Sequence, residues 1–545
     1  MKRSAFLLPI LLLSACSPES DEQVPGNSVY NPEALLYVEG SMIDIRKVQA
    51  GEMVYPQNDE LTFSAQNVTV LGTGRLYATS LREYQGVERI CADCPTTLQI
   101  AMVMGTDPGT EWTAEKTRFQ IGSLHYQFYS LLYDTPGEWV KIPSGGAAAT
   151  LVFGKRFSVS GVPDPPGTII ARATELRKRN ISNPSIMVLD DGSYFAGSSG
   201  PNPKGNTYFR SVDKGRTWER LSNPDYMNFC KCFTRPSDRH TLYEVGVSAA
   251  KRGNIVIRKS EDRGRSWSAL TTLFKGDYHG APTPYVEYQE RIWHAMGTSP
   301  ETGKMGIVVL SIAQDADPMR KENWTLTNVL EGGPNSWFAG SGVTHNTQRS
   351  FNQWQEGCIV PDPEGRLTIV TRIDESSWSD VAALIRIVDE HLIAFDPTMD
   401  FIDMPGGGKK FTIHYDKQSR KYWTLVNPCY DEDRRQVHAG WYCNRINPLF
   451  LRSRLVLCSS SDLRNWTVEK EVISSNNCFF HGFQYVDWVF DGDDIIAVSR
   501  TAFSESRGLP NRQHDANFLT FHRIRNFRNA KFETIHCDYD QLKKI

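Results

Sequence analysis

The chain has 545 residues, too many for one ordinary hydrophobic core, so its length predicts at least two domains. Apolar residues make up 40% of the chain and charged residues 23%, a balance typical of folded globular proteins and unlike that of disordered ones. The formal net charge of −3 excludes a strongly basic chain, and with it the electrostatic basis for binding nucleic acid or an anionic membrane surface.

The N-terminus has the pattern of a signal peptide. A basic Met-Lys-Arg start at 1–3 precedes an apolar run over 5–13 that is too short to span a membrane. The run ends in Leu-Ser-Ala-Cys16, which resembles a bacterial lipobox. The resemblance implies removal of residues 1–15, a lipid such as palmitate on Cys16, and, because Ser17 follows, the outer membrane. We therefore expect an exported, lipid-anchored protein that faces the periplasm or the outside, with a polar tether over 16–32.

The cysteines that follow Cys16 are even in number, and an exported protein can pair such cysteines as disulfides. The sequence alone leaves their pairing open. Cys429, His438 and Cys443, with one more cysteine, are a candidate structural zinc site, although their spacing fits no common zinc motif. No catalytic metal and no organic cofactor are expected.

Residues 33–165 alternate apolar and polar residues in short runs separated by glycine and proline. Examples are 61–65 (Leu-Thr-Phe-Ser-Ala) and 68–71 (Val-Thr-Val-Leu). Such alternation is typical of strands with one buried face, so the segment 33–165 predicts a β-sandwich domain. A Gly/Pro-rich linker over 161–167 and a short polar helix over 171–179 are expected to follow.

A repeat marks the rest of the chain. The sequences at 211–218 (Ser-Val-Asp-Lys-Gly-Arg-Thr-Trp) and 260–267 (Ser-Glu-Asp-Arg-Gly-Arg-Ser-Trp) share one pattern, and 460–466 is a shortened copy. In each, the aspartate can accept backbone N–H groups of a turn, and the glycine of the full copies can take a positive φ. A period of about 50 residues fits one four-stranded blade of a β-propeller. We expect the propeller over 175–530, with six blades or alternatively seven, and a C-terminal tail over 531–545.

These turns resemble the Asp-box, or BNR repeat, of the sialidase (neuraminidase) superfamily. The resemblance extends over about 180–525 and implies an all-β, sialidase-like propeller. In that family a glutamate opens a segment Glu-x-x-x-Val-x-x-x-x-Gly-x-Leu, and an arginine that binds the substrate carboxylate follows. Glu356, Val360, Gly365 and Leu367 match the segment, and Arg372 matches the arginine.

Two further positions match the family. Arg452 precedes the strand that leads into the third Asp-box copy, as a second carboxylate-binding arginine does, and Arg454 is the alternative because it lies on the same face of that strand. Tyr485, in a Tyr-x-Asp segment before Asp491-Gly492, matches the nucleophile. A phenol needs a neighbouring carboxylate to take its proton, and the resemblance assigns that role to Glu356.

The sequence departs from the family at two places. Asn183 stands where the first arginine of the carboxylate-binding triad is expected, and the loop 198–206 lacks the usual acid/base aspartate. Either His279 or His514 could serve as the acid in its place, and Arg500 could add a positive charge. The expected catalytic residues are therefore Tyr485, Glu356, His279 and His514, and the expected substrate-binding residues are Arg372, Arg452, Arg500, His481, Gln484, Asp487 and Asn183.

These residues predict a divergent, sialidase-like glycoside hydrolase that degrades an acidic poly- or oligosaccharide. One alternative is a polysaccharide lyase, in which arginine neutralises a uronate while tyrosine and histidine move protons. The other alternative is a surface lipoprotein that binds glycan without catalysis. A phenol paired with a carboxylate favours an enzyme, since binding alone needs only aromatic and amide groups.

Overall fold

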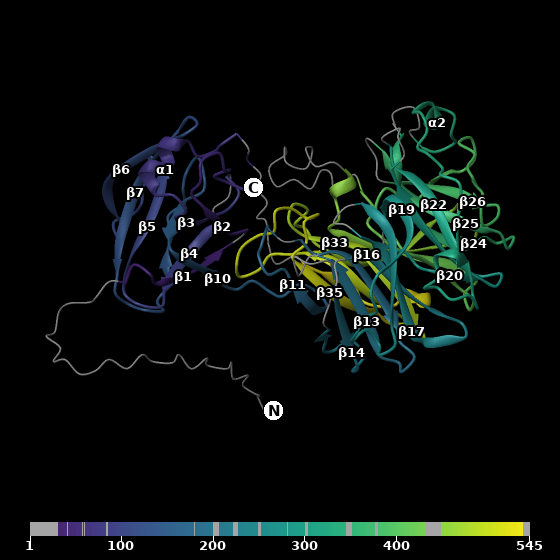
Figure 1. Ribbon diagram of the computed structural model, residues 1–545. Coiled ribbons are helices and arrows are strands. Elements are labelled where there is room, and N and C mark those ends of the chain that lie inside the picture. Colours follow the sequence, from purple (N-terminus) through teal and green to yellow (C-terminus); the bar gives the residue numbers. More distant parts are fainter. Residues whose placement is uncertain are drawn as a thin grey trace, which may run out of the picture.

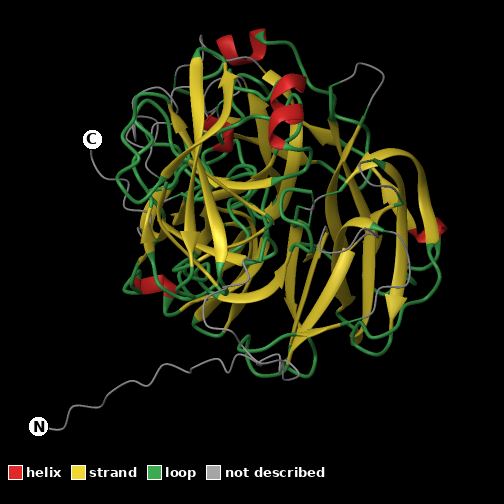
Figure 2. Cartoon of the chain, turned by 90° about the vertical axis from the view of Figure 1, so that its left-hand side faces the viewer, coloured by secondary structure: helices red, strands yellow, loops and turns green. Residues whose placement is uncertain are grey.

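A computed structural model describes residues 31–537, apart from gaps at 41, 57, 59, 83–85, 179, 200–205, 222–226, 249–251, 281, 300–303, 345–350, 376–379 and 431–447. Nearly all of its secondary structure is β (Figure 2). Two bodies lie side by side, a smaller one at the left of Figure 1 and a larger one at the right. The all-β class expected from the sequence is confirmed.

The smaller body is a β-sandwich. One sheet contains β10 (Arg156–Val159), β1 (Leu35–Gly40), β4 (Val87–Ala92) and β8 (Val140–Lys141). The other contains β2 (Asp44–Lys47), β3 (Leu76–Thr79), β9 (Leu151–Gly154), β5 (Thr96–Val103), β7 (Leu124–Tyr133) and β6 (Thr113–Ile121). Apolar side chains of both sheets, among them Val38, Ile90 and Ile100, share one core without exposure to solvent. Burial of these faces holds the sheets together.

One expected strand of the sandwich is wrong. Residues 65–71, which include the alternating run 68–71, form the helix α1 (Ala65–Leu71). Ser64 caps this helix, because its hydroxyl accepts a hydrogen bond from the Asn67 N–H (3.1 Å) while the Asn67 side chain accepts one from the Ser64 N–H (2.8 Å). This reciprocal cap outweighs the β preference of two valines and one threonine.

The larger body consists of antiparallel meanders. One sheet is formed by β12 (Ser182–Val188), β13 (Tyr194–Ser199), β14 (Asn206–Ser211) and β15 (Glu219–Arg220). An eight-stranded sheet joins two meanders where β19 pairs with β21. Its strands are β16 (Asn228–Arg235), β17 (Asp238–Val247), β18 (Gly253–Ser260), β19 (Thr271–His279), β20 (Val286–Tyr288), β21 (Arg291–Thr298), β22 (Gly306–Ala313) and β23 (Trp324–Leu326).

Three more sheets complete the larger body. The first has β24 (Phe351–Pro361), β25 (Leu367–Glu375), β26 (Val381–Ile387), β27 (Ile393–Ala394) and β28 (Phe401–Asp403), and the second has β29 (Ile413–Asp416), β30 (Lys421–Val426), β31 (Arg454–Ser460), β32 (Thr467–Ser474) and β36 (Ile535–His536). The third has β33 (Gly482–Asp491), β34 (Asp494–Ala502), β35 (Phe518–Ile524) and β11 (Thr168–Arg172). Short helices α2 (Ser336–Ala339), η1 (Lys321–Asn323), η4 (Pro448–Phe450) and η5 (Phe527–Asn529) lie between strands.

The meanders close into a ring. Strand β12 lies against β16, β21 against β24, β24 against β29, β30 against β33, and β33 against β12. The ring closes because β11 pairs with β35. Strand β11 comes first in the propeller, and β35 comes near the C-terminal end of the chain. The body is therefore a β-propeller, while its blade number of six, or seven, stays a prediction. The helix expected over 171–179 is wrong, because Ala171 and Arg172 belong to the closing strand β11.

The repeated turns have the expected local geometry. Asp213 accepts hydrogen bonds from the Arg216 N–H (3.1 Å) and the Thr217 N–H (2.9 Å), and Gly215 has a φ of 87°. A Cβ on Gly215 would lie 2.2 Å from the Phe521 ring, so this position requires glycine. The turn joins β14 and β15, the last two strands of its sheet, and so stabilises the outer part of the propeller.

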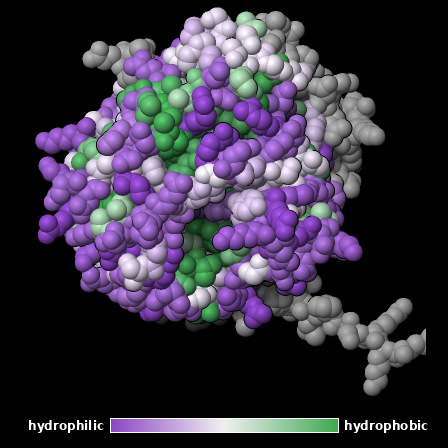
Figure 3. Space-filling view, turned by 90° about the vertical axis from the view of Figure 1, so that its right-hand side faces the viewer, coloured by the Kyte–Doolittle hydropathy of each residue, from purple (hydrophilic) through white to green (hydrophobic). Residues whose placement is uncertain are grey.

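The propeller face turned away from the sandwich is mainly hydrophilic, with apolar patches among the polar side chains (Figure 3). Among the described residues, no helix combines the length and the apolar character that a membrane span requires. The segment expected to be a tail is partly structured, since Ile535–His536 forms β36 and pairs in parallel with β32.

Candidate active site

Bulges near the start of four strands mark one end of the propeller. The pairing register shifts within 182–185 of β12, 228–231 of β16, 354–357 of β24 and 484–487 of β33. Asn183, Phe229 and Tyr485 in these bulges have positive φ values of 52°, 53° and 52°. Each of these strands is the first of its meander, so the bulges recur at the same end of the ring. Bulges redirect side chains out of the regular alternation and are frequent beside functional sites.

Tyr485 lies at the centre of the residues brought together there. Its left-handed backbone conformation is strained for a bulky side chain, which indicates that the surrounding packing holds the ring in a defined place. The Tyr485 hydroxyl accepts a hydrogen bond from Arg372 Nη1 (3.1 Å). The same nitrogen lies 3.0 Å from Glu356 Oε2. One arginine therefore links the predicted nucleophile to the predicted base.

The Glu356–Arg372 pair is buried and held rigidly. Arg372 Nε donates to the Gly408 carbonyl (2.7 Å), which fixes the guanidinium plane. The side chains of Glu356 and Arg372 expose only 5% and 10% of their surfaces. Burial alone would raise the pKa of Glu356, but the charge of Arg372, together with His279 and the hydrogen bonds to the carboxylate, holds that pKa below its ordinary value. Glu356 is therefore an anion at neutral pH.

Two more arginines lie over the Tyr485 ring. The guanidinium carbon of Arg452 is 5.0 Å from the ring centroid and that of Arg500 is 4.9 Å away, both within cation–π range. With Arg372, three guanidinium groups surround one phenol. Arg454, the alternative to Arg452, instead contacts Glu471 (3.0 Å). Of the two alternatives, Arg452 is therefore the arginine that lies beside Tyr485.

Arg452 lacks hydrogen-bond acceptors for most of its donors. It is 1% exposed, and its Nε donates to the Leu449 carbonyl (3.2 Å). Within the part of the chain that the structure describes, neither Nη1 nor Nη2 of Arg452 has a hydrogen-bond partner. Burial, with the nearby charges of Arg372 and Arg500, lowers the pKa of Arg452 to about 9. A buried cation without an anion is costly, so this side chain is suited to receive an anionic group from a ligand.

His514 enters the site from the loop between β34 and β35. Its ring stands edge-on to Tyr485, with 6.3 Å between centroids, and its Nδ1 lies 2.9 Å from Asp515 Oδ1. Burial lowers the pKa of His514 to about 3, although its hydrogen bond to Asp515 acts to raise that pKa. The imidazole is therefore neutral at neutral pH. The contact with Asp515 favours the tautomer whose proton is on Nδ1, which leaves Nε2 as an acceptor.

His279 lies at the end of β19, packed on Phe229 with 4.3 Å between ring centroids. Burial lowers its pKa, against the opposing charge of Glu356. His279 is thus electrostatically coupled to the Glu356–Arg372 pair, and it too is neutral at neutral pH.

Gln484 and Arg500 hold the His514 loop. The Gln484 Nε2 donates to the carbonyls of Gln513 (2.5 Å) and His514 (3.1 Å), and Arg500 Nη2 donates to the His514 carbonyl (2.6 Å). Gln484 itself is fully buried. It therefore positions the loop and is a poor candidate for substrate contact, contrary to the expectation from sequence.

Asp487 and His481 also differ from the expectation that they bind substrate. Asp487 is fully buried and accepts hydrogen bonds from the Ile186 N–H (2.8 Å), Thr412 Oγ1 (3.1 Å) and Lys231 Nζ. It therefore ties three neighbouring sheets together near the axis. His481, also fully buried, contacts the hydroxyls of Ser475 (2.8 Å) and Ser504 (3.0 Å). Burial lowers the pKa of His481 to about 3, so it is a neutral core residue.

Asn183 occupies the bulge of β12 at the same end of the ring and is 5% exposed. Its Nδ2 donates to Ser182 Oγ (3.4 Å).

Asp515 is not among the site residues expected from the sequence, although the dipeptide His514-Asp515 in a long loop could have indicated it. The aspartate is itself anionic: burial opposes ionisation, but the hydrogen bond with His514 and the charge of Arg512 lower its pKa.

The candidate zinc site lies mostly outside the described residues, which include Cys429 but neither His438 nor Cys443. The residues that the structure describes contain no group of three or more side chains that could hold a metal ion. Cys16 also lies outside them, so its lipidation stays a prediction.

Comparisons with known proteins find similarity in structure alone. No protein-family model matches the chain, and no curated protein is significantly similar in sequence. A Hadza microbial sialidase matches with 10% identity and a TM-score of 0.43, over 80% of this chain and 91% of that one. The α-L-arabinofuranosidase of Fusarium graminearum bound to arabinobiose matches with 11% identity and a TM-score of 0.42, over 67% and 98%. A Trypanosoma rangeli sialidase has 11% identity and a TM-score of 0.42, over 63% and 55%.

Proposed function

We propose that the chain is a glycoside hydrolase that acts on a glycan bearing a carboxylate. The single observation that carries this proposal is the link Glu356–Arg372–Tyr485, in which Arg372 Nη1 contacts both oxygens at 3.0 and 3.1 Å. Tyr485 lies in a bulge and is only partly buried, so we expect a substrate to reach its hydroxyl beside the buried carboxylate. The pair is suited to nucleophilic catalysis.

The geometry suggests the following mechanism. The Tyr485 oxygen attacks the anomeric carbon, and its proton passes to the Glu356 carboxylate. The bond from that carbon to the leaving oxygen breaks, a glycosyl–tyrosine bond forms, and the leaving oxygen takes a proton from solvent. Water then attacks the same carbon and releases one proton to solvent, while the proton on Glu356 returns to the Tyr485 oxygen, which restores both groups. Arg372 favours negative charge on both oxygens in turn, and so supports each step electrostatically.

Arg452 would bind the substrate carboxylate. Its two Nη groups are buried, lack acceptors among the described residues and lie over the Tyr485 ring. Two parallel N–H donors match the two oxygens of a carboxylate. An acidic sugar with its carboxylate near the anomeric carbon would satisfy this geometry, and Arg500 would add a second positive charge.

The leaving group would receive little help from a protein acid. Glu356 and Asp515 are anionic, and His279 and His514 are neutral, because the pKa of each group is lowered. At neutral pH none of the four therefore carries an acidic proton ready for transfer. The proposed enzyme should prefer substrates with good leaving groups, such as aryl glycosides, over alkyl glycosides.

The two neutral histidines favour a lyase as a second candidate. A lyase must remove the proton next to a uronate carboxylate, and a neutral imidazole beside arginine can act as that base. His514 has the required tautomer, since its contact with Asp515 leaves Nε2 as an acceptor. Arg452 would neutralise the uronate in this reaction as well.

The experiment is an activity screen of the purified chain on acidic polysaccharides, sialosides and their aryl glycosides. New reducing ends without ultraviolet absorbance from an unsaturated product indicate the hydrolase. New reducing ends with that absorbance indicate the lyase. Binding without any turnover would refute both and support a glycan-binding lipoprotein. We further propose, from residues 1–16 alone, that the protein is exported and anchored through a lipid on Cys16.

A further inference from the structure

The segment 503–517, between β34 and β35, connects the sandwich to the candidate active site. It is long for a connection within a meander, and such loops usually serve function. Many of its residues are nevertheless buried, including Leu509, Gln513 and Asn517. In Figure 1 this yellow segment lies between the purple sandwich and the sheets of the propeller. Contacts on both sides therefore fix its course.

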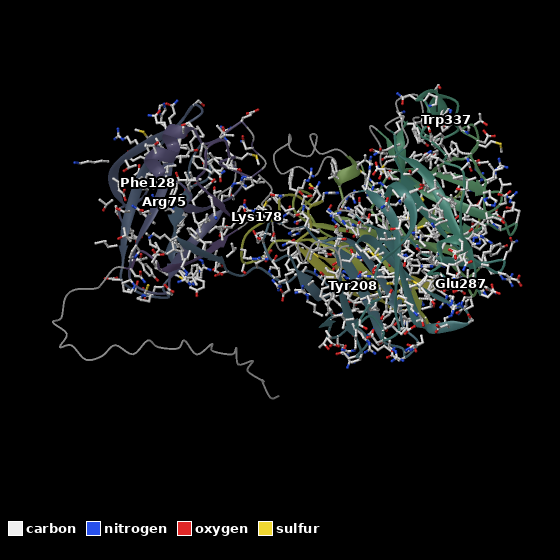
Figure 4. The ribbon with its side chains drawn as sticks, in the orientation of Figure 1. Arg75, Phe128, Lys178, Tyr208, Glu287 and Trp337 are labelled. Carbon is white, nitrogen blue, oxygen red and sulfur yellow. The ribbon has the colours of Figure 1, made fainter. Side chains whose placement is uncertain are left out.

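The sandwich holds the first half of the segment. Asp44 on β2 is 2% exposed, and it accepts hydrogen bonds from the Leu509 N–H (3.3 Å) and from Arg177 Nη2. Arg177 in turn donates to the carbonyls of Leu509 (3.1 Å) and Ile45 (2.7 Å). Arg177 thus bridges the sandwich and the loop. Its neighbour Lys178 is labelled between the two bodies in Figure 4.

Gly508 shows how closely the loop approaches the sandwich. A Cβ at this position would lie 2.9 Å from Asp44 Oδ1 and 3.0 Å from the Ile45 nitrogen. Its φ of 114° is also unfavourable for other residues. A second contact, from the Val159 N–H to the Ser506 carbonyl (2.8 Å), fixes the preceding residues on the sandwich. The docking therefore depends on close backbone contact as well as on charge.

The second half of the same segment carries His514 and Asp515 into the site. Five positions after Leu509, the His514 carbonyl accepts hydrogen bonds from Arg500 Nη2 (2.6 Å) and Gln484 Nε2 (3.1 Å). Its side chain then faces Tyr485. Only five positions along the chain separate the contact of Leu509 with the sandwich from the contacts of His514 at the candidate site.

We propose that the sandwich is part of the catalytic machinery, with Asp44 and Arg177 as positioning residues that set the place of His514 beside Tyr485. This inference rests on the proposed function. The sandwich thereby acts as a support for the active-site loop, whether or not it also binds glycan. His514 packs against the Tyr485 ring, and its carbonyl holds Arg500 over the same ring, so displacement of the loop displaces the groups around the nucleophile. A shift of about 1 Å in a catalytic group can reduce the rate about 100-fold, so loss of the support should be visible in turnover.

Two variants test the proposal by different means. Asp44→Asn removes the charge that holds Arg177, whereas Gly508→Ala leaves every charge in place and forces the loop away from Asp44. Asp416→Asn is the matched control, since Asp416 is also buried (5% exposed) and holds Arg528 through both oxygens (2.7 and 2.9 Å). Amide hydrogen exchange of 509–515 is measured together with kcat and KM.

We expect exchange over 509–515 to become at least about 10-fold faster in D44N and G508A, and kcat to fall about 10- to 100-fold with little change in KM. D416N should change neither quantity. Unchanged exchange in the folded variants, or faster exchange with unchanged kcat, would overturn the proposal. If the wild-type chain shows no turnover, the proposed function fails by itself, and exchange still decides whether the sandwich holds the loop. If D44N does not fold, G508A decides alone.

Discussion

At the scale of single residues, the candidate site is marked by Arg452, a buried cation whose two Nη groups lack a hydrogen-bond partner among the described residues. Arg258 shows the usual solution: it is fully buried, and its Nε donates to Glu244 Oε2 (2.8 Å). Arg452 is equally buried, but in the part of the chain that the structure describes its Nε contacts a backbone carbonyl and its two Nη groups have no hydrogen-bond partner. We therefore infer that Arg258 stabilises the fold, whereas Arg452 is suited to bind an anionic ligand.

Replacement of Arg452 should therefore have opposite effects on stability and binding. We expect Arg452→Met to raise the free energy of unfolding by about 1–4 kcal/mol, because a desolvated charge is replaced by an apolar side chain of similar volume. Affinity for the acidic glycan should fall at least 10-fold. Urea unfolding and calorimetric titration measure the two effects.

Arg258→Met is the matched control for this prediction. It should lower the free energy of unfolding by about 3–5 kcal/mol, because it leaves Glu244 buried without its cation. If R452M were destabilised to the same extent, Arg452 would be a structural residue like Arg258.

At the scale of secondary-structure elements, the aspartate turns and the bulges have different roles. Asp262 accepts hydrogen bonds from the Ser266 N–H (2.8 Å) and from the hydroxyls of Ser266 and Ser260 (2.5 and 2.8 Å) in an outer turn. The bulges, in contrast, carry the residues of the site. The turns thus stabilise the sheets, whereas the bulges set the positions of side chains in the candidate site.

Asp262→Ala should lower the free energy of unfolding by about 2 kcal/mol through loss of these hydrogen bonds. The activity at a temperature well below the unfolding transition should not change. A fall in kcat/KM without a matching loss of stability would show that the turn contributes to the site.

Four residues of the candidate site were expected from sequence, because the resemblance to the sialidase superfamily assigns a position to each of them. Glu356, Arg372, Arg452 and Tyr485 occupy positions that a motif defines, and the structure brings them together. Asp487 lies in the same short segment as Tyr485, but spacing along the chain does not reveal burial, and the bulge places these two residues in different surroundings.

Other features depend on contacts between distant parts of the chain and were not predictable. The strand β11 forms at 168–172 only because β35 offers it an edge 350 residues later. The polar residues that follow this strand instead favour the expectation of a helix over 171–179. The hydrogen bond from the Leu509 N–H to Asp44 likewise joins residues 465 positions apart. Tertiary contact overrides local pattern in both cases.

At the scale of the whole molecule, acid should unfold the protein through its buried histidines. Burial lowers the pKa of His294, His481 and His514 to about 3, and that of His414 and His522 to about 4. The unfolded chain binds protons at these residues below about pH 6.5, where the folded chain does not. Stability is therefore complete above pH 6.5 and decreases as the pH falls.

Each such histidine contributes a loss of up to about 1.4 kcal/mol per pH unit below its unfolded pKa. Urea unfolding at pH 7, 6 and 5 measures the slope. His481→Asn, outside the candidate site, should make the slope shallower by about one proton. A free energy of unfolding that stays constant over this range would contradict the assignment of these residues as neutral in the folded state.

Catalysis by Tyr485 is the central part of the proposed function, and the chain offers its own control. Tyr208 also combines with a glutamate and an arginine, since it donates to Glu244 Oε1 (2.6 Å) and accepts from Arg258 Nη2 (2.8 Å). It belongs to a hydrophobic cluster with Phe195 and Leu242 and is labelled in the lower part of the propeller in Figure 4, so it is a core residue whose hydroxyl is already satisfied by protein partners.

The measurement is kcat for Tyr485→Phe and Tyr208→Phe on the substrate that the activity screen identifies. We predict that Y485F loses at least about 1,000-fold in kcat and keeps its stability, because only the nucleophilic oxygen is removed. Y208F should keep kcat within about twofold and lose stability instead. Turnover by Y485F close to that of the wild-type chain would contradict the account.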